Sequence, residues 1–346
     1  MQRVWSILLG AMICSCSHGG STMPDPVIEP PTTPPVSTVA LRTVRVHTAT
    51  ELKAALSDAK PGDDIILADG SYKGRFVIDP DKNGTTAHPI TLRGSRNAIL
   101  NAESIQTGYV LYLQSSYWII KGITLTNGLK GLMIDGSRKS VIDSIMVFNI
   151  GEEGIHLRKK SSVNTIQRVE VTQTGLKTPD FGEGIYIGSA KNNWATYTNG
   201  NPDLCDSNSI LNNRIGPLVA AECIDVKEGT TGGIIAGNLF DATGVTGANS
   251  GDSWMDVKGN DYLIDSNTAT NPGGAIFKDG YQVHCAVNGW GNNNVFKNNT
   301  CTVNASGYGF NVQLSGSNGT TTGNKVYGNN TVTGAASGIA NIPLTN

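Results

Sequence analysis

The segments "ECIDVKEGTTGG" at residues 222–233 and "DSWMDVKGNDY" at residues 252–262 share a core of an apolar residue followed by Asp, Val and Lys. The two cores lie 31 residues apart. Within each core, apolar side chains alternate with polar ones, which is the period of a β-strand with one buried face. Two such copies in close succession indicate a fold built by stacking one unit on the next.

A five-residue unit with apolar second and fourth positions recurs beyond these two copies. Its occurrences are GLMID (131–135), GIHLR (154–158), GIYIG (184–188), CIDVK (223–227), WMDVK (254–258), GYQVH (280–284) and GFNVQ (309–313). A second series of short strands follows the first, and Gly- and Asn-rich segments connect them. This pattern predicts an all-β chain folded as a single-domain right-handed parallel β-helix.

The beginning of the repeat and the turns within it agree with a β-helix. Residues 50–59, "TELKAALSDA", predict an N-capped amphipathic helix that covers the first open coil. Asn residues recur three positions after an Ile or Val of the second strand series, and we expect their side chains to form a ladder that satisfies turn amides. These residues are Asn213, Asn238, Asn267, Asn298 and Asn329.

The first residues of the chain predict export. Arg3 precedes the apolar run 4–13, which is too short to span a bilayer and predicts a signal peptide over residues 1–15. The run ends in "ICSC", which resembles a bacterial lipoprotein box and implies lipidation of Cys16. Residues 16–41 form a Pro/Thr-rich tether, and residues 42–346 form the β-helix domain. We expect a periplasmic or outer-membrane or cell-surface lipoprotein, or otherwise a secreted protein, that contacts a membrane only through the lipid on Cys16.

Composition and cysteine count narrow the class of protein. Charged residues make up 16% of the chain and the net charge is −2, which argues against a nucleic-acid binder. The four cysteines after the signal favour two disulfides in an exported protein over a metal site. Sequence proximity suggests Cys205–Cys223 and Cys285–Cys301, although three pairings are open. We expect the protein to be a monomer.

Stacking turns the repeated unit into columns of side chains, because equivalent residues on adjacent coils lie about 4.8 Å apart. The third and fifth positions point outward on one face. The third position runs through Met133, His156, Tyr186, Asp225, Asp256, Gln282 and Asn311, and the fifth through Asp135, Arg158, Gly188, Lys227, Lys258, His284 and Gln313. Such a concentration of acids, bases and hydrogen-bonding groups predicts a binding groove in preference to a network of surface ion pairs.

The groove has the groups that β-elimination of a uronic-acid polysaccharide needs. One group must neutralise the uronate carboxylate, and a base must remove the proton from C5. A lysine beside a second cation has a lowered pKa, so we expect Lys227 to be the base and Lys258 to neutralise the carboxylate, with the two roles exchangeable. The candidates for substrate binding are Arg158, His156, Tyr186, Asp225, Asp256, Gln282 and His284.

The segment "AECIDVK" at residues 221–227 resembles the catalytic segment of polysaccharide lyase family six, which contains alginate lyases and chondroitinase B. That family carries a Glu ligand of calcium five residues before its Lys base, on a parallel β-helix. Glu222 and Lys227 have this spacing. The opening "ATELKAALSDAKPGDDIILADGSYKG" at residues 49–74 is also similar to that of the family. The resemblance implies a lyase, with the β-helix as its catalytic domain and calcium at Glu222.

Two departures from the family concern the metal and the carboxylate. The family has another acidic ligand two residues before its Glu, where this sequence has Ala220. Glu183, one coil away from Glu222, is the candidate that replaces this ligand. The catalytic Arg of the family is replaced by Lys258, which lacks the fork that binds a carboxylate through two hydrogen bonds.

Two other functions remain open from the sequence. Asp225 and Asp256 form a stacked carboxylate pair, which would suit a retaining glycoside hydrolase. The same groove could also belong to a non-catalytic, glycan-binding surface protein, although such a protein has little need for adjacent lysines. The sequence favours a lyase whose partner is an acidic polysaccharide.

Overall fold

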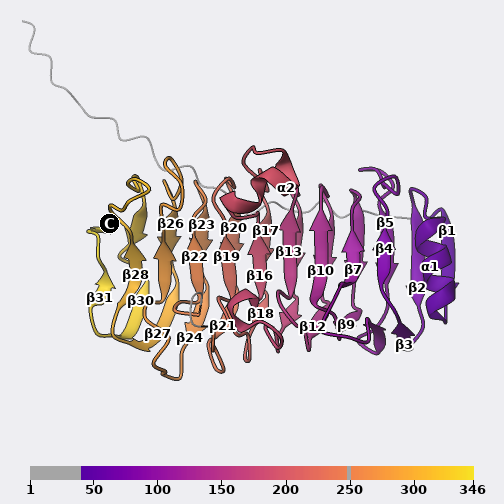
Figure 1. Cartoon of the computed structure of the whole chain (residues 1–346), viewed down its shortest axis with the longest axis horizontal. Coiled ribbons are helices and arrows are strands. Elements are labelled where there is room, and N and C mark those ends of the chain that lie inside the picture. Colours follow the sequence, from indigo (N-terminus) through magenta and orange to yellow (C-terminus); the bar gives the residue numbers. More distant parts are fainter. Residues whose placement is uncertain (1–39, 248–250) are drawn as a thin grey trace, which may run out of the picture. The chain divides into compact units, whose positions relative to one another are not determined.

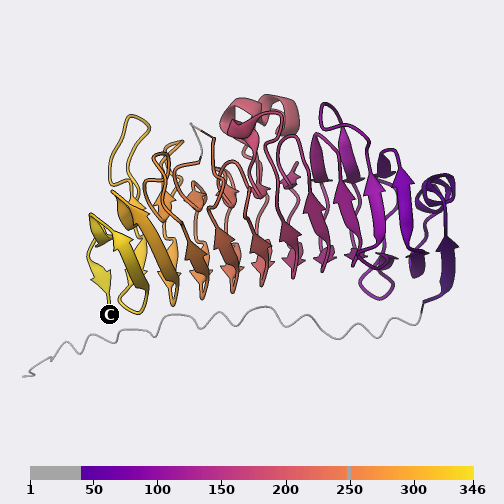
Figure 2. The ribbon, with the colours of Figure 1, turned by 90° about the horizontal axis from the view of Figure 1, so that it is seen from below.

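The strands of the chain wind into a parallel β-helix, as the repeat predicts (Figures 1 and 2). The computed structural model describes residues 40–247 and 251–346. Within these ranges each coil adds a strand to three parallel sheets, so hydrogen-bonded neighbours are not consecutive in the chain. Parallel strand connections of this kind are right-handed, which is the predicted hand. The all-β fold class is confirmed.

The three sheets are named A, B and C, and the strands of each lie side by side in the order of the chain. Sheet A contains β1 (Arg42–Val46), β2 (Asp63–Leu67), β5 (Ile90–Arg93), β8 (Trp118–Lys121), β11 (Val141–Asp143), β14 (Thr165–Gln167), β17 (Ser209–Leu211), β20 (Ile234–Ala236), β23 (Leu263–Asp265), β26 (Val295–Lys297), β29 (Lys325–Tyr327) and β32 (Leu344–Thr345). Sheet B contains β3 (Gly70–Lys73), β6 (Ala98–Asn101), β9 (Thr124–Thr126), β12 (Met146–Phe148), β15 (Glu170–Val171), β18 (Arg214–Ile215), β21 (Leu239–Asp241), β24 (Thr268–Thr270), β27 (Thr300–Ala305) and β30 (Thr331–Ala335). Sheet C contains β4 (Phe76–Ile78), β7 (Tyr109–Leu113), β10 (Lys130–Asp135), β13 (Ile155–Arg158), β16 (Ile185–Ile187), β19 (Ile224–Val226), β22 (Met255–Val257), β25 (Tyr281–Val283), β28 (Tyr308–Val312) and β31 (Gly338–Ala340). The helices are α1 (Ala49–Ser57), η1 (Pro179–Phe181), η2 (Lys191–Asn193) and α2 (Trp194–Thr198).

The inside of the β-helix is a continuous apolar core. Side chains alternate along each strand, and in β19 the inward Ile224 and Val226 are fully buried. Toward the C-terminal coils the core becomes aromatic, and the rings of Tyr281 and Phe310 stack with their centroids 5.1 Å apart. Burial of each such side chain contributes about 1.5–3 kcal/mol to stability. The core therefore holds the coils together, which leaves the outward positions for function.

Helix α1 covers the first coils and lies at the indigo end of Figure 1. It begins at residue 49, one residue before the predicted start, because Thr48 is the N-cap and its hydroxyl accepts the Glu51 amide. Its buried residues Leu52 and Leu56 pack toward β1, β3 and β4. The predicted capping helix is therefore confirmed, and it shields an edge that would otherwise expose strand hydrogen-bonding groups.

An Asn ladder runs along one turn of the coils, but two of its members differ from the prediction. The ladder consists of Asn213, Asn238, Asn267, Asn299 and Asn330, and each side-chain oxygen accepts the backbone amide of the preceding member. The predicted Asn298 and Asn329 lie one residue outside it and bond to each other at the surface. Asn residues occur in pairs at these two turns, so spacing alone selected the wrong one.

The four described cysteines are free thiols, so the predicted pairs Cys205–Cys223 and Cys285–Cys301 are not formed. All four are buried. Cys205 contacts the carbonyl of Leu157 near the end of β13, whereas Cys223 lies just before β19. Proximity in sequence therefore did not bring the thiols together. Cys205 and Cys223 lie at opposite ends of the sheet C strands, and Cys301 lies on β27 of sheet B whereas Cys285 follows β25 of sheet C.

The predicted signal peptide, Cys16 and nearly all of the tether lie outside the described residues. Their assignments stay predictions. In the part of the chain that the structure describes, no helix is both long and apolar enough to cross a membrane. The coils themselves belong to one compact unit.

Candidate active site

The outward face of sheet C carries the predicted column of functional residues. The strand register pairs His156 with Tyr186, Tyr186 with Asp225, and Asp225 with Asp256. Asp256 in turn pairs with Gln282. Adjacent strands of a sheet lie about 4.8 Å apart, so each coil adds one functional group at a nearly constant interval. The predicted third-position column is confirmed.

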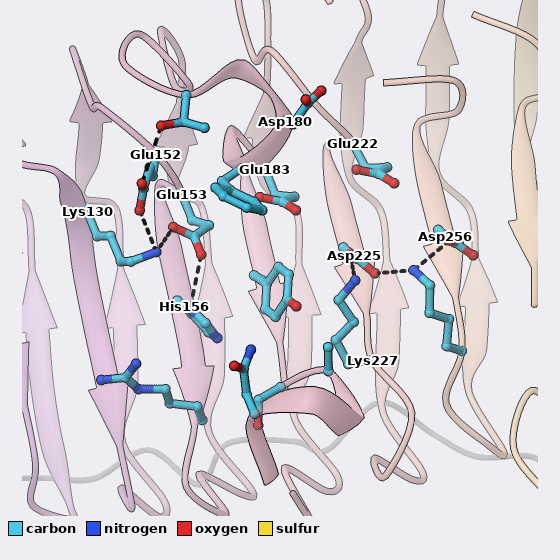
Figure 3. Close-up of a pocket in the computed structure, with 18 of the residues that line it drawn as sticks. Lys130, Glu152, Glu153, His156, Asp180, Glu183, Glu222, Asp225, Lys227 and Asp256 are labelled. Atoms are coloured by element: carbon cyan, nitrogen blue, oxygen red, sulfur yellow. Dashed lines mark hydrogen bonds and ion pairs between the residues drawn. The ribbon is translucent and has the colours of Figure 1, made fainter. Parts of the chain in front are cut away.

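Two insertions border this face around β16. Residues 172–184 precede β16 and contain η1, whereas residues 188–208 follow it and contain η2 and α2. The two insertions meet opposite ends of the same strand, so they border sheet C on two sides, and α2 stands out from the coils in Figures 1 and 2. Between them lies a cavity of about 640 Å³, shown in Figure 3.

A chain of alternating charges lies in this cavity (Figure 3). Asp225 is 1% exposed and pairs with the ammonium groups of both Lys227 and Lys258. Lys258 Nζ lies 2.9 Å from Oδ1 of Asp225 and 2.6 Å from Oδ2 of Asp256. The other oxygen of Asp256 lies 2.7 Å from His284 Nδ1. The two lysines that the repeat stacks on adjacent coils therefore have a carboxylate between them, because Asp225 binds both.

The predicted lowering of the lysine pKa values is wrong. Burial lowers the pKa of Lys227, but the charge and hydrogen bond of Asp225, together with the charges of Glu183 and Asp256, outweigh burial and leave the pKa above its usual value. Lys258 is affected in the same way by Asp225 and Asp256. Both lysines are therefore ammonium ions in the ligand-free protein. The repeat correctly predicts neighbouring lysines, but it does not show that a buried carboxylate bonds to both.

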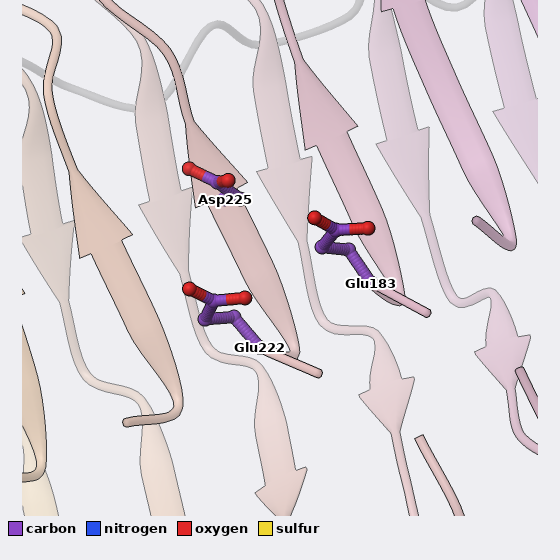
Figure 4. A group of neighbouring side chains, drawn as sticks. All are labelled: Glu183, Glu222 and Asp225. Atoms are coloured by element: carbon purple, nitrogen blue, oxygen red, sulfur yellow. The ribbon is translucent and has the colours of Figure 1, made fainter. Parts of the chain in front are cut away.

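Glu183, Glu222 and Asp225 form an acid cluster beside these lysines (Figure 4). One ligand oxygen from each lies within 4.8 Å of the others. A carboxylate oxygen of Glu183 and another of Glu222 are buried and bond to no described group. Burial, with the charges of Glu153 and Asp225, raises the pKa of Glu183 to about 8, and burial raises that of Glu222 well above its usual range. Such a cluster could hold a metal ion.

The predicted replacement of the acidic ligand missing at Ala220 is consistent with this cluster. Glu183 lies one coil from Glu222, as the strand register of β16 and β19 requires. Asp225 supplies the third carboxylate, although the sequence alone ranks it as a substrate-binding residue. Its two roles arise because its carboxylate lies between the lysines and the two glutamates.

A second group of charges lies on the N-terminal side of the cavity. Glu153 pairs with Lys130, and its other oxygen lies 3.3 Å from His156 Nδ1. Lys130 is also 3.0 Å from Glu152. Because His156 Nε2 lies 2.9 Å from the carbonyl of Gly188, both ring nitrogens face oxygen atoms. Burial would raise the pKa of Glu153, but His156 and Lys130 lower it to about 2.

Tyr186 lies between these two groups of charges. Its ring packs on that of His156 with centroids 4.4 Å apart, and Lys227 Nζ lies 4.8 Å from its centroid. Its hydroxyl bonds to no other described residue, and its side chain lines the cavity. Burial and the nearby Asp225 raise its pKa well above the usual value, so the phenol is protonated at neutral pH. A protonated phenol beside a lysine is suited to moving protons on a bound substrate.

The remaining predicted residues occupy the two ends of the groove. Arg158 lines the cavity two coils away from Lys227. His284 lines an adjoining hollow of about 310 Å³. Gln282 is buried and donates a hydrogen bond of 3.1 Å to Asp279, and its contact with substrate stays a prediction.

Several lining residues were not predicted from the sequence. Lys130 lies one residue and Glu152 two residues before the five-residue unit that follows, so columns of these flanking positions would have identified them. Phe181 and Tyr197 belong to the two insertions. The insertions have no period, and the sequence therefore carries no signal for which of their side chains face the cavity.

Comparisons with known proteins agree with this fold. A family model described as "Pel9A-like, right handed beta helix region" matches residues 38–174. The crystal structure of an alginate lyase from Paenibacillus sp. str. FPU-7 is 42% identical in sequence, with a TM-score of 0.80. The match covers 87% of this chain and 99% of that lyase. No curated protein sequence matches the chain.

Two more distant structures share the architecture. A mannuronic acid specific polysaccharide family 6 lyase from human gut microbiota is 12% identical, covering 80% of this chain and 67% of its own, with a TM-score of 0.50. A rhamnogalacturonan lyase is 11% identical, covering 84% and 87%, with a TM-score of 0.56. At these identities the similarity concerns the fold alone. The similarity to the Paenibacillus enzyme extends over nearly all of that protein, and this chain therefore belongs to its family, the right-handed β-helix polysaccharide lyases.

Proposed function

We propose that this lyase cleaves alginate by β-elimination in the cavity on sheet C. One observation carries the proposal: the ammonium groups of Lys227 and Lys258 share Asp225 beside two buried carboxylate oxygens that have no partner among the described residues, in a cavity bordered on two sides. Ammonium groups and a cation site together suit a substrate with a carboxylate next to the reacting carbon. The 42% identity to an alginate lyase supports alginate as that substrate.

The acid cluster of Glu183, Glu222 and Asp225 fits a hard divalent cation, and we take it to be Ca²⁺. Its ligands are carboxylate oxygens, which Ca²⁺ prefers. Two of these oxygens are buried without a hydrogen-bond partner among the described residues, which would be costly in a site meant to stay without a ligand. When bound there, the cation would attract the uronate carboxylate and cancel part of the negative charge that raises the pKa of Lys227.

We assign proton transfer to Lys227 and Tyr186. Lys227, in its neutral form, takes the proton from C5 of the uronate. The electron pair of that C–H bond forms the double bond between C4 and C5, and the bond from C4 to the leaving oxygen breaks. The Tyr186 hydroxyl gives its proton to that oxygen. The two side chains are neighbours on adjacent coils, so one sugar ring can contact both.

Lys258 stays an ammonium ion in this proposal and helps to neutralise the uronate carboxylate. Asp225 binds it from one side, and Asp256, itself bonded to His284, binds it from the other. Burial would raise the pKa of Asp256, but Lys258 and His284 hold it below its usual value. An ionised Asp256 cannot supply the proton that a glycoside hydrolase requires, so we assign Asp225 and Asp256 to positioning the lysines.

The ultraviolet absorbance of unsaturated uronate tests this proposal. The purified protein is incubated with alginate, pectate and glucuronan, with and without Ca²⁺. We expect a signal with alginate that falls at least about 100-fold in Lys227→Ala and in Tyr186→Phe. Lys297→Ala is the control, because Lys297 pairs with Asp265 away from the cavity and should keep full activity.

Other outcomes would redirect the assignment. New reducing ends without absorbance would indicate hydrolysis by the carboxylate pair. Binding of polysaccharide without either product would indicate a glycan-binding protein. Absorbance with pectate or glucuronan alone would keep the lyase chemistry and replace the substrate.

A further inference from the structure

Arg158 is held in one orientation at the N-terminal part of the cavity. Its Nε and Nη2 donate hydrogen bonds of 2.6 and 3.2 Å to Asp135, and Nη2 donates one of 3.2 Å to the Tyr109 hydroxyl. The Tyr197 ring from α2 packs against the guanidinium, with Cζ 4.3 Å from the ring centroid. These contacts fix a side chain that would otherwise have many rotamers, so little entropy is lost when it binds a ligand.

One edge of this guanidinium is left without a protein partner. Nη1 carries two N–H groups, and no described residue accepts a hydrogen bond from it. The Arg158 side chain is 8% exposed, so part of it is open to the cavity that it lines. Because Arg158 lines the cavity, these two donors are available to a ligand there.

The surroundings of Arg158 leave a positive charge for such a ligand. Asp135 is shared, because Lys159 Nζ lies 3.0 Å from it and the Tyr112 hydroxyl donates to it at 2.6 Å. Two cations therefore face one carboxylate. A group with net positive charge and free N–H donors is suited to an anion, and the planar guanidinium matches a carboxylate.

The position of Arg158 relates it to the proposed cleavage site. Arg158 ends β13, and Lys227 follows β19, with β16 between them. Two intervals between neighbouring strands of a sheet span about 10 Å, which is therefore the distance between β13 and β19. The coil between carries Gly188 at the equivalent position, so that position places no side chain between the two cations. Each pyranose residue of an extended chain advances the chain by nearly the distance between adjacent coils. A uronate two residues from the one at Lys227 would therefore bring its carboxylate to Arg158.

We propose that Arg158, supported by Asp135 and Tyr197, forms a distal subsite that binds the carboxylate of a uronate two sugar residues from the one cleaved at Lys227. This subsite rests on the proposed function, since it takes the direction of the polysaccharide chain from the cleavage site. It requires that the polysaccharide run along the axis of the β-helix. It also makes affinity depend on chain length.

Equilibrium binding to an inactive background tests the subsite. Lys227→Ala and the double variant Lys227→Ala, Arg158→Met are titrated calorimetrically with oligosaccharides of increasing length prepared from alginate. In the single variant we expect affinity to increase when the chain becomes long enough to reach Arg158. In the double variant this increase should be lost, which corresponds to about 10- to 100-fold weaker binding of long chains. Short chains should bind equally to both.

Two controls separate the subsite from a general loss of structure. Lys160→Met removes a charge from an exposed neighbour of the site and should leave binding of all lengths unchanged. If Arg158→Met does not fold, Tyr197→Ala removes only the stacked ring and should weaken long chains selectively. Thermal unfolding of each variant shows whether the fold is retained.

The results that overturn the subsite differ from those that overturn the lyase. An equal loss for short and long chains, no loss at all, or the same loss with neutral oligosaccharides would exclude a distal carboxylate site. Because binding is measured without turnover, a wild-type protein that releases no unsaturated product would reject the proposed function while the subsite is still decided by the titration.

Discussion

Replacing Asp225 by Asn should destabilise the protein through Lys227. The substitution keeps the size of the side chain but removes the charge that the two lysines share. Lys258 keeps its pair with Asp256 at 2.6 Å. Lys227 has no second ion pair among the described residues, so its ammonium group is left in a largely buried site without a counter-charge.

The expected loss follows from the burial of this pair. Removal of one partner of a buried ion pair costs about 3–5 kcal/mol in the free energy of unfolding. The Lys227 side chain is 14% exposed, so some water can reach it, and we expect a value near the lower end. A loss of about 3 kcal/mol lowers the melting temperature of a chain of this size by roughly 4–5 °C.

The difference between wild type and variant should also depend on pH. In the wild type the pKa of Lys227 is raised above 10.5, so its stabilising contribution is complete below that pH and is lost only as the pH passes the folded-state value. In Asp225→Asn, burial lowers this pKa, and of the carboxylates that raise it only Glu183 and Asp256 remain. Lys227 in the variant therefore loses its proton at a lower pH than in the wild type, and the melting temperature should approach that of the wild type as the pH rises from 7 to 10.

Thermal unfolding followed by circular dichroism at pH 7 and pH 10 measures both effects. Lys297→Ala is the control, because Lys297 and Asp265 form an exposed pair at 3.6 Å whose removal should cost less than about 1 kcal/mol. If Asp225→Asn melts with the wild type at pH 7, or if the difference is the same at both pH values, Asp225 does not neutralise Lys227.

Three further outcomes test other parts of the structure. EDTA should lower the activity on alginate and shift what remains to higher pH, because the negative charge near Lys227 is no longer cancelled; activity that is indifferent to EDTA and to added Ca²⁺ would remove calcium from the proposal. In Glu153→Gln the free energy of unfolding should fall less on acidification than it does in the wild type. Against the effect of burial, His156 holds the pKa of Glu153 at about 2, so a contribution of about 3 kcal/mol is present above pH 4.5 and is lost toward pH 2; parallel curves for both proteins would contradict this. Asn267→Ala should cost about 1–3 kcal/mol in urea unfolding because buried amides lose their partner, whereas Asn298→Ala at the surface should cost less; equal costs would argue against the ladder.

The fold and the order of residues along the site could be predicted from the sequence. A period of two along each strand separates inward from outward residues, and a recurring unit fixes which residues become neighbours on adjacent coils. For that reason the repeat alone aligns Tyr186, Asp225 and Asp256 correctly. The capping helix could be predicted for a similar reason, since its N-cap and apolar face are local features.

The direction of each side chain within the face could not be predicted. Asp225 bonds to both lysines and also joins two glutamates, and this sharing reversed the predicted change in the lysine pKa values. Such a contact depends on rotamers and on burial under the insertions. Tyr197 illustrates the second difficulty, because it reaches Arg158 from an insertion that has no counterpart in the repeat.

The parallel strands of sheet C have a consequence for how this protein can change over evolution. The intervals along the third-position column are set by main-chain hydrogen bonds between coils, which do not depend on the outward side chains. A point mutation at Tyr186 or Asp256 therefore alters what a coil offers to a sugar without moving what its neighbours offer. New specificities can arise one coil at a time, at fixed pitch, while the rest of the groove keeps its dimensions.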